Sequence, residues 1–243
     1  VILGIQLAAG IITSPLRVFL PIYLKEFLSF RIVTISFIIA LGQVLAMITS
    51  LAAGALSDVI GRRKILLIGI AALAIGPLLF LSRHFLLTTT IGIISISSIS
   101  FRSLGGMGIM IAETNPAKLG FVSALFHWGL TIGGVIGGLA AGIILDNWGY
   151  SSFGLIFFLF SLVTFLFGLN FLPGKKVDLQ NKQKSAIHLK VYYLLLKRKS
   201  VLMIGLLRFL PTVYWGMANV LIPILIKDVS NSNTTVALYA SIS

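Results

Sequence analysis

Two long apolar runs meet at the polar stretch GALSDVIGRRK, residues 54–64. Gly61 permits a tight turn, because glycine reaches backbone conformations that other residues avoid. Gly54 has no side chain and lets a second helix approach closely. Asp58 can face the amino-terminal end of a helix or pair with the arginines that follow it. The stretch therefore predicts two apolar helices joined by a short, charged turn.

The composition of the chain is that of a membrane protein. Of its 243 residues, 58% are hydrophobic and only 10% are charged, and the mean hydropathy is +1.06. A soluble domain carries roughly 45–50% apolar and about 25% charged residues. These values exclude an ordinary soluble globule, a disordered chain and a typical nucleic-acid-binding protein. The chain has no cysteine, which excludes disulfides and thiolate metal sites, and no metal or cofactor site is predicted.

Apolar runs long enough to cross a bilayer recur along the whole chain. A membrane helix needs about 20 mostly apolar residues. Such runs fall at 2–24, 33–56, 65–82, 86–111, 120–145, 153–172 and 201–226, with an eighth beginning near Thr234. The chain starts and stops within apolar runs, so we expect a fragment of a longer protein. Three parts are expected: a six-helix half over 1–172, a cytoplasmic basic linker over 173–200, and the start of a second half over 201–243.

The lysines and arginines indicate an orientation. The formal net charge is +13, and most of the basic residues outside the spans lie in the loop at 61–64, beside residue 118 and in the linker 173–200. Cytoplasmic loops of membrane proteins carry such an excess. We therefore expect these segments to be cytoplasmic, in a multi-pass protein of the prokaryotic plasma membrane.

A short motif repeats with an offset of 202 residues. The sequence PIYLKE (21–26) at the exit of the first span resembles PILIKD (223–228) at the exit of the seventh. The same offset superposes two polar helix faces that played no part in choosing it. These faces are Gln6, Gly10, Thr13 and Arg17 in the first span, and Arg208, Thr212, Trp215 and Asn219 in the seventh. The repeat predicts a central cavity between two halves that are repeated in parallel.

Three motifs together resemble those of the major facilitator superfamily. Residues 54–64 resemble its signature loop, Gly-x-Leu-Ala/Ser-Asp-Arg-x-Gly-Arg-Arg/Lys, with Val59 in place of the usual basic residue. The run RSLGGMG (102–108) resembles the family's Arg-x-x-Gln-Gly-x-Gly element, with Gly105 in place of glutamine. In the fifth span, the glycine spacing of the family's antiporter motif is matched, without its proline, by Gly133, Gly137 and Gly142.

The resemblance implies an all-α integral membrane protein with two parallel-repeated six-helix halves, here truncated after about seven transmembrane helices. It implies a secondary active transporter that moves a small solute by alternating access, coupled to an ion or to exchange. In this family the signature loop latches one half against the other in the outward-open state. The resemblance thus assigns a gating role to Gly54, Asp58, Gly61, Arg62 and Arg63. A drug-type efflux antiporter, an organic-anion carrier and a non-transporting sensor all stay open.

Polar side chains at membrane depth usually face a cavity or a partner, because exposing them to lipid is costly. Besides the two repeated faces, the candidates for the substrate cavity are Ser36, Gln43, Ser98, Arg102 and His127. His127 can carry a proton or contact substrate, or be hydrogen-bonded to a neighbouring helix. Arg17 and Arg208 can clamp an anionic substrate, or extend toward the membrane surface. The seven spans have no carboxylate at mid-membrane depth, so proton coupling would need His127 or residues beyond this chain.

Channel and enzyme functions are not favoured. The tripeptide Asn115-Pro116-Ala117 occurs in aquaporins, but that fold needs two copies and the chain has one. No serine lies in a Gly-x-Ser-x-Gly elbow, and no histidine pairs with carboxylates at metal-ligand spacing. The expected partners are a small-molecule substrate, H+ or a counter-solute, and the lipid bilayer. Nucleic acid is not an expected partner, and a monomer is expected.

Overall fold

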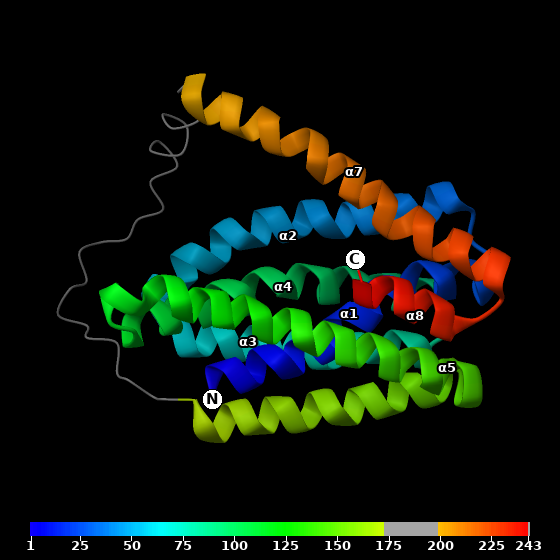
Figure 1. Ribbon diagram of the computed structural model, residues 1–243, viewed down its shortest axis with the longest axis horizontal. Coiled ribbons are helices and arrows are strands. Elements are labelled where there is room, and N and C mark those ends of the chain that lie inside the picture. The colour runs from blue at the N-terminus through cyan, green and yellow to red at the C-terminus, as the bar shows by residue number, and fades with distance from the viewer. Residues whose placement is uncertain (173–198, 243) are drawn as a thin grey trace.

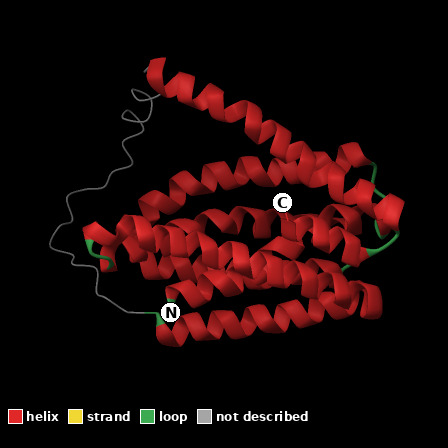
Figure 2. Ribbon diagram, in the orientation of Figure 1, coloured by secondary structure: helices red, strands yellow, loops and turns green. Residues whose placement is uncertain are grey.

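The computed structural model describes residues 1–172 and 199–242, and every regular element in these two ranges is a helix (Figure 2). The expected linker over 173–200 lies almost entirely outside the described residues. Within the described ranges, the side chains at 51, 55, 58, 201, 202, 204–206, 208–210, 212, 213 and 242 are not part of the description. The predicted all-α class is confirmed.

Short turns connect successive helices in the first 172 residues. The elements are α1 (Ile2–Glu26), α2 (Ile32–Ile60), α3 (Arg62–Ile75), the 3-10 helix η1 (Gly76–Leu81), α4 (Phe85–Glu113), the 3-10 turn η2 (Pro116–Lys118), α5 (Leu119–Phe171), α7 (Lys199–Ser230) and α8 (Asn233–Ile242). Among the described residues, five segments are long and apolar enough to cross a membrane. The first four expected spans match α1, α2, α3 with η1, and α4 closely.

The element α5 contains the fifth and sixth expected spans. Its backbone leaves the helical conformation at Gly149, where φ is 73° and ψ is −178°. At this point the chain reverses direction, and its two arms run back along each other (Figure 1). A positive φ favours glycine because other residues have a Cβ that clashes there. Gly149 therefore separates two antiparallel membrane helices.

The two ends of the helix bundle hold different connections. We call the end that carries residues 61–64 and η2 the basic end, and the other the opposite end. In Figure 1 the basic end is at the left, and the opposite end holds the α1–α2 connection, Gly149 and the turn between α7 and α8.

Glycines bring α1 and α5 into backbone contact. A Cβ added at Gly133 would lie 2.0 Å from the carbonyl oxygen of Leu7, and one added at Gly137 would lie 2.1 Å from that of Ile11. Distances this short leave no room for a side chain. Small residues allow membrane helices to pack by close van der Waals contact, since lipid supplies no hydrophobic drive between them. Part of the glycine pattern that resembles the antiporter motif is thus used to hold α1 against α5.

The core continues from the first six spans into the two last helices. Aromatic rings at the opposite end pack in pairs, among them Tyr23 with Phe80 and Tyr23 with Tyr150, each pair with ring centroids 5.1 Å apart. The same buried cluster includes Val220 of α7 and Val236 of α8. The opposite end is therefore one continuous core that joins both parts of the chain.

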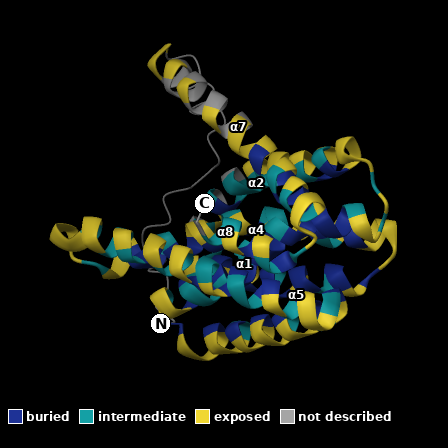
Figure 3. Cartoon of the chain, turned by 45° about the vertical axis from the view of Figure 1, so that its right-hand side comes forward, coloured by how far each residue is buried: buried dark blue, intermediate teal, exposed yellow. Residues whose placement is uncertain are grey.

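By contrast, α7 departs from the other helices toward the basic end. Val220 and Ile224 are 4% and 3% exposed, whereas Met203 and Leu207 are 58% and 74% exposed. Figures 1 and 3 show the same divergence, with the start of α7 standing away from α2. Among the described residues, the two repeated helices α1 and α7 therefore approach each other at the opposite end.

Prolines interrupt both repeated helices. Pro15 and Pro21 lie inside α1, and Pro211 and Pro223 lie inside α7. Pro21 and Pro223 are the first residues of the two repeated hexamers, and both are buried. Each repeated helix thus has a buried proline a few residues before it terminates at the opposite end.

Candidate functional site

The two repeated hexamers meet at the opposite end. Lys25 Nζ donates a hydrogen bond to Asp228 Oδ1 at 2.6 Å, and the two side chains are 32% and 52% exposed. A narrow cavity beside this ion pair is lined by Ile22, Lys25, Glu26, Ile224, Lys227 and Asp228, which are equivalent positions of the repeat. The repeat, recognised in the sequence only as a pattern, is thus also a direct contact between α1 and α7.

The signature loop makes its contacts within the first half. Arg62 Nη1 donates to the Gly108 carbonyl of α4 at 2.6 Å, and Arg63 Nη2 donates to the Leu169 carbonyl at 2.8 Å. Leu169 lies in the last turn of its helix, where carbonyls have no intrahelical donor and favour cations. Gly61 has φ 93°, as the predicted tight turn requires. The loop therefore ties the second and third spans to the ends of the fourth and sixth.

At the other two signature positions the contacts differ from the expectation or are not described. Nothing lies within 4 Å of a Cβ added at Gly54, so the close helix approach expected there is not found among the described residues. The side chain of Asp58 lies outside the description.

Gln6 and Arg102 form a buried polar pair. The Arg102 Nη1 group donates to Gln6 Oε1, and the two residues are 3% and 1% exposed. Two of their other nitrogens, Arg102 Nε and Gln6 Nε2, are buried and have no hydrogen-bond partner among the described residues. Both residues were expected to line the cavity, but the structure places them between α1 and α4, inside the first half. A polar pattern in the sequence shows which face of a helix is polar, but it does not show which other helix packs against that face.

Removing the amide partner of Arg102 is expected to destabilise the first half. In Gln6→Leu the guanidinium of Arg102 stays buried and loses its described acceptor. This loss lowers the free energy of unfolding by about 1–3 kcal/mol. The unfolding temperature measured in detergent should fall by several degrees. Gln43→Leu, at an exposed position of α2, is the matched control and should change it little. Equal effects of the two substitutions would show that the pair contributes no specific stability.

The other polar candidates on the first half divide into buried and exposed positions. Thr13 is half-buried and donates to the Ala9 carbonyl of its own helix at 2.7 Å. Ser98 is buried and donates to the Ser95 carbonyl at 2.6 Å. Ser36 is half-buried, whereas Arg17, Gln43 and His127 are exposed. The exposed three are the polar candidates of this half whose side chains are not covered by other described residues.

Two of the four candidates on α7 are described in full. Trp215 is 49% exposed, and the Asn219 amide donates to the Trp215 carbonyl at 2.6 Å. The side chains of Arg208 and Thr212 lie outside the description, so the predicted pairing of Arg17 with Arg208 stays a prediction.

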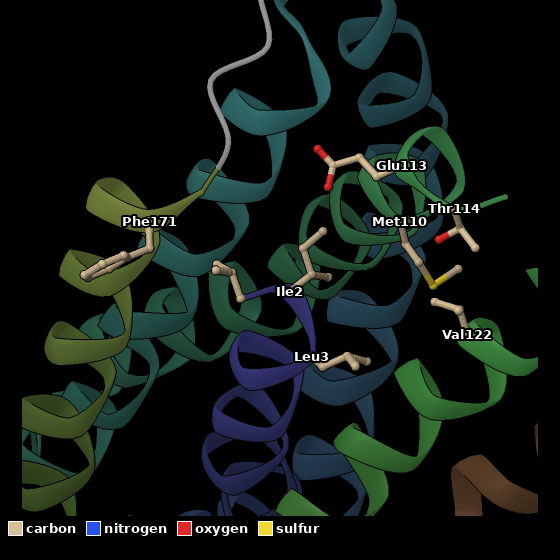
Figure 4. Close-up of a pocket in the computed structure, with 8 residues that line it drawn as sticks. Ile2, Leu3, Met110, Glu113, Thr114, Val122 and Phe171 are labelled. Carbon is tan, nitrogen blue, oxygen red and sulfur yellow. The ribbon is translucent and has the colours of Figure 1, made fainter.

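A larger cavity of about 510 Å³ opens at the basic end, away from these residues. Its walls come from the start of α1, the end of α4 and both ends of α5, as Figure 4 shows. The lining residues are Val1, Ile2, Leu3, Met110, Glu113, Thr114, Val122 and Phe171. No residue that the sequence assigned to the substrate cavity is among them.

Sequence reasoning missed the contact of Asp146, which follows the fifth apolar run. Asp146 Oδ1 accepts from the Asn233 N–H at 2.9 Å, and Oδ2 accepts from the Thr234 N–H at 2.9 Å and from its hydroxyl at 2.6 Å. In the sequence, Asp146 is a polar residue at the end of an apolar run, as many are. Nothing in the sequence links it to Asn233 and Thr234, which lie 87 and 88 residues away.

Comparison with known proteins identifies the family. A family model described as Major Facilitator Superfamily matches residues 2–243 of this chain. A relative described as an uncharacterized transporter, BU588, from Buchnera aphidicola subsp. Acyrthosiphon pisum (strain APS) is 29% identical over 162 residues. That alignment covers 65% of this chain and 38% of the relative. The helical bundle, the membrane-spanning segments and a match over nearly the whole sequence confirm the predicted family: this chain belongs to the major facilitator superfamily and is a multi-pass membrane protein.

Proposed function

We propose that this protein is a secondary active transporter that moves a small solute by alternating access, coupled to an ion or to exchange. The observation that supports this best is the arrangement of the repeated helices, which touch at Lys25 and Asp228 and part toward the basic end. A bundle closed at one face and open at the other is one of the two forms that alternating access requires. Residues 1–172 then form one half, 173–200 the linker, and 201–243 the start of the second half.

We place the basic end in the cytoplasm of a prokaryotic cell, with the protein acting as a monomer in the plasma membrane. The excess of lysine and arginine at that end supports this orientation. The bacterial origin of the relative supports the cell type. The described form is then open toward the cytoplasm, and in it Arg62 and Arg63 bind carbonyls of their own half.

A specific observation favours an anionic solute. Arg17 is exposed on α1 and has no hydrogen-bond or ion-pair partner among the described residues. Its equivalent in the repeat is Asn219, and the other arginine of the repeated faces, Arg208, lies on α7. Guanidinium groups match the geometry of carboxylates and phosphates. A drug-type exporter is the second candidate, supported by the glycine pattern of the fifth span.

Ligand stabilisation of the whole protein in detergent tests this function. The panel contains organic anions, lipophilic cations and neutral sugars, and each compound is added to the wild type and to Arg17→Gln/Arg208→Gln. We expect anions to raise the unfolding temperature of the wild type by a few degrees through linkage, and to lose this effect in the variant. Arg31→Gln/Arg83→Gln, at exposed positions outside the spans, is the matched control and should respond as the wild type does.

A stabilising compound is then tested for uphill accumulation in proteoliposomes under an imposed ion gradient. Stabilisation by lipophilic cations in both proteins would favour the exporter instead. Binding without accumulation under any gradient would contradict transport and favour a transporter-derived sensor.

A further inference from the structure

One edge of α5 faces α8 at four-residue spacing. A Cβ added at Gly142 would lie 2.6 Å from the Cβ of Ala237, and one added at Gly138 would lie 3.3 Å from Ser241 Oγ. Asp146 continues this edge to the opposite end, where it binds the first turn of α8. A different edge of α5, which carries Gly133 and Gly137, contacts α1. The helix α5 therefore holds its own half on one side and the second half on the other.

Asp146 accepts hydrogen bonds from the first N–H groups of α8. The first N–H groups of a helix have no intrahelical acceptor, and a carboxylate there is favoured by both hydrogen bonding and the helix dipole. The helix α8 also has a cap from its own chain, since Ser232 Oγ accepts from the Thr235 N–H at 3.3 Å. Ser232 in turn donates to Asp146 at 3.2 Å. Because α8 keeps its own cap, the main effect of Asp146 is on the contact between α5 and α8.

The ion pair at the same end is a second contact between the two parts of the chain. Lys25 and Asp228 are 32% and 52% exposed, and Asp146 is exposed as well, so water and salt screen both contacts. Asp146 differs in its partners, two of which are backbone N–H groups that the helix fixes in direction. Such bonds weaken steeply when the angle at the hydrogen falls below about 120°, so a rotation of one half against the other breaks them.

We propose that Asp146 is a lock between the two halves, which holds the opposite face closed and is released when the protein opens there. The lock rests on the proposed alternating-access function. Its place at the end of the bundle suits this role, because rocking of the halves separates the end residues further than the Gly138–Ser241 contact nearer the middle. The lock does not touch the solute; it sets how often the opposite face is open.

Distance measurement between two spin labels tests the lock without knowledge of the solute. The chain has no cysteine, so labels can be placed at Arg83→Cys and Val229→Cys in the whole protein in liposomes. Both positions are exposed at the opposite end, one on each half. In Asp146→Ala we expect the ratio of long to short distances to rise roughly fivefold, the effect of losing a hydrogen bond between the two halves.

Two variants separate the lock from a general loss of structure. Asp146→Asn keeps an oxygen that accepts one of the N–H bonds, and asparagine caps helices about as well as aspartate, so its shift should be smaller. Asn147→Ala removes the neighbouring exposed side chain, which donates back to Ile143 of its own helix at 2.8 Å, and should leave the distances unchanged.

The possible failures can be told apart. If Lys25→Ala/Asp228→Ala lengthens the distance and Asp146→Ala does not, the lock is wrong and alternating access stands. An equal shift in Asn147→Ala would also overturn the lock, since the effect would not be specific to the carboxylate. A single distance in every variant would contradict alternating access, and the lock with it.

Discussion

Gly137→Leu is expected to lower the unfolding temperature by roughly 10 °C or more, or to abolish folding. A Cβ at this position would lie 2.1 Å from the Ile11 carbonyl oxygen and 2.5 Å from the Ile11 Cα. The obstacle is backbone, so no side-chain rotation can relieve it and α1 must move away from α5. Overpacking costs about 1–3 kcal/mol where neighbours can adjust, and here they cannot. Thermal unfolding in detergent measures the effect, at about 2–4 °C per kcal/mol for a chain of this size.

The control for this prediction lies on the same helix. A Cβ at Gly120 has nothing within 4 Å, so Gly120→Leu should leave stability unchanged or improve it slightly through helix propensity. If Gly137→Leu unfolds at the same temperature as Gly120→Leu, the backbone contact between α1 and α5 does not exist in the membrane protein.

Cross-linking Lys25→Cys to Asp228→Cys is expected to stop transport almost completely. The two native side chains touch across the opposite face, and alternating access requires this face to open once in every cycle. A bifunctional thiol reagent that forms disulfides with both cysteines and is long enough to replace the ion pair should therefore reduce uptake at least tenfold in proteoliposomes. A reductant that cleaves the bridge should restore it. Each single variant with the same reagent should transport normally, because the exposed ion pair itself contributes little.

A second cysteine pair distinguishes a blocked gate from chemical damage. The rings of Phe30 and Phe85 are 5.3 Å apart, and both residues belong to the first half. Phe30→Cys/Phe85→Cys should therefore keep its uptake after cross-linking, since this half moves as a unit. Full uptake by the cross-linked Lys25→Cys/Asp228→Cys protein would mean that the opposite face need not open.

The fold was largely predictable because each membrane span can be recognised from the length and hydropathy of its own sequence. Length and hydropathy located the first four spans, and the glycine at position 61 marked the turn between the second and third. The expected spans 120–145 and 153–172 likewise bracket the reversal at Gly149. Each of these features depends only on residues that are near in sequence, so no knowledge of the other helices was needed.

The site was less predictable because its contacts join helices that are far apart in the chain. The repeat identified equivalent positions in α1 and α7 but not that Lys25 and Asp228 would touch. Polarity placed Gln6 and Arg102 at membrane depth, but only packing shows that they bind each other. Asp146 gave no signal, since two of its partners are backbone N–H groups, which every residue except proline provides, and the others are hydroxyls of a common type.

The two buried prolines of the repeat have a consequence for how the helices can bend. Proline has no N–H, so a proline inside a helix removes the hydrogen bond to the carbonyl four residues earlier. For Pro21 and Pro223 these carbonyls belong to Arg17 and Asn219, the last members of the two superposed polar faces. Sharp bends of helices usually occur at prolines. Each repeated helix thus has a point of weakened backbone hydrogen bonding at a matching position, just before the hexamer that contacts the other repeat.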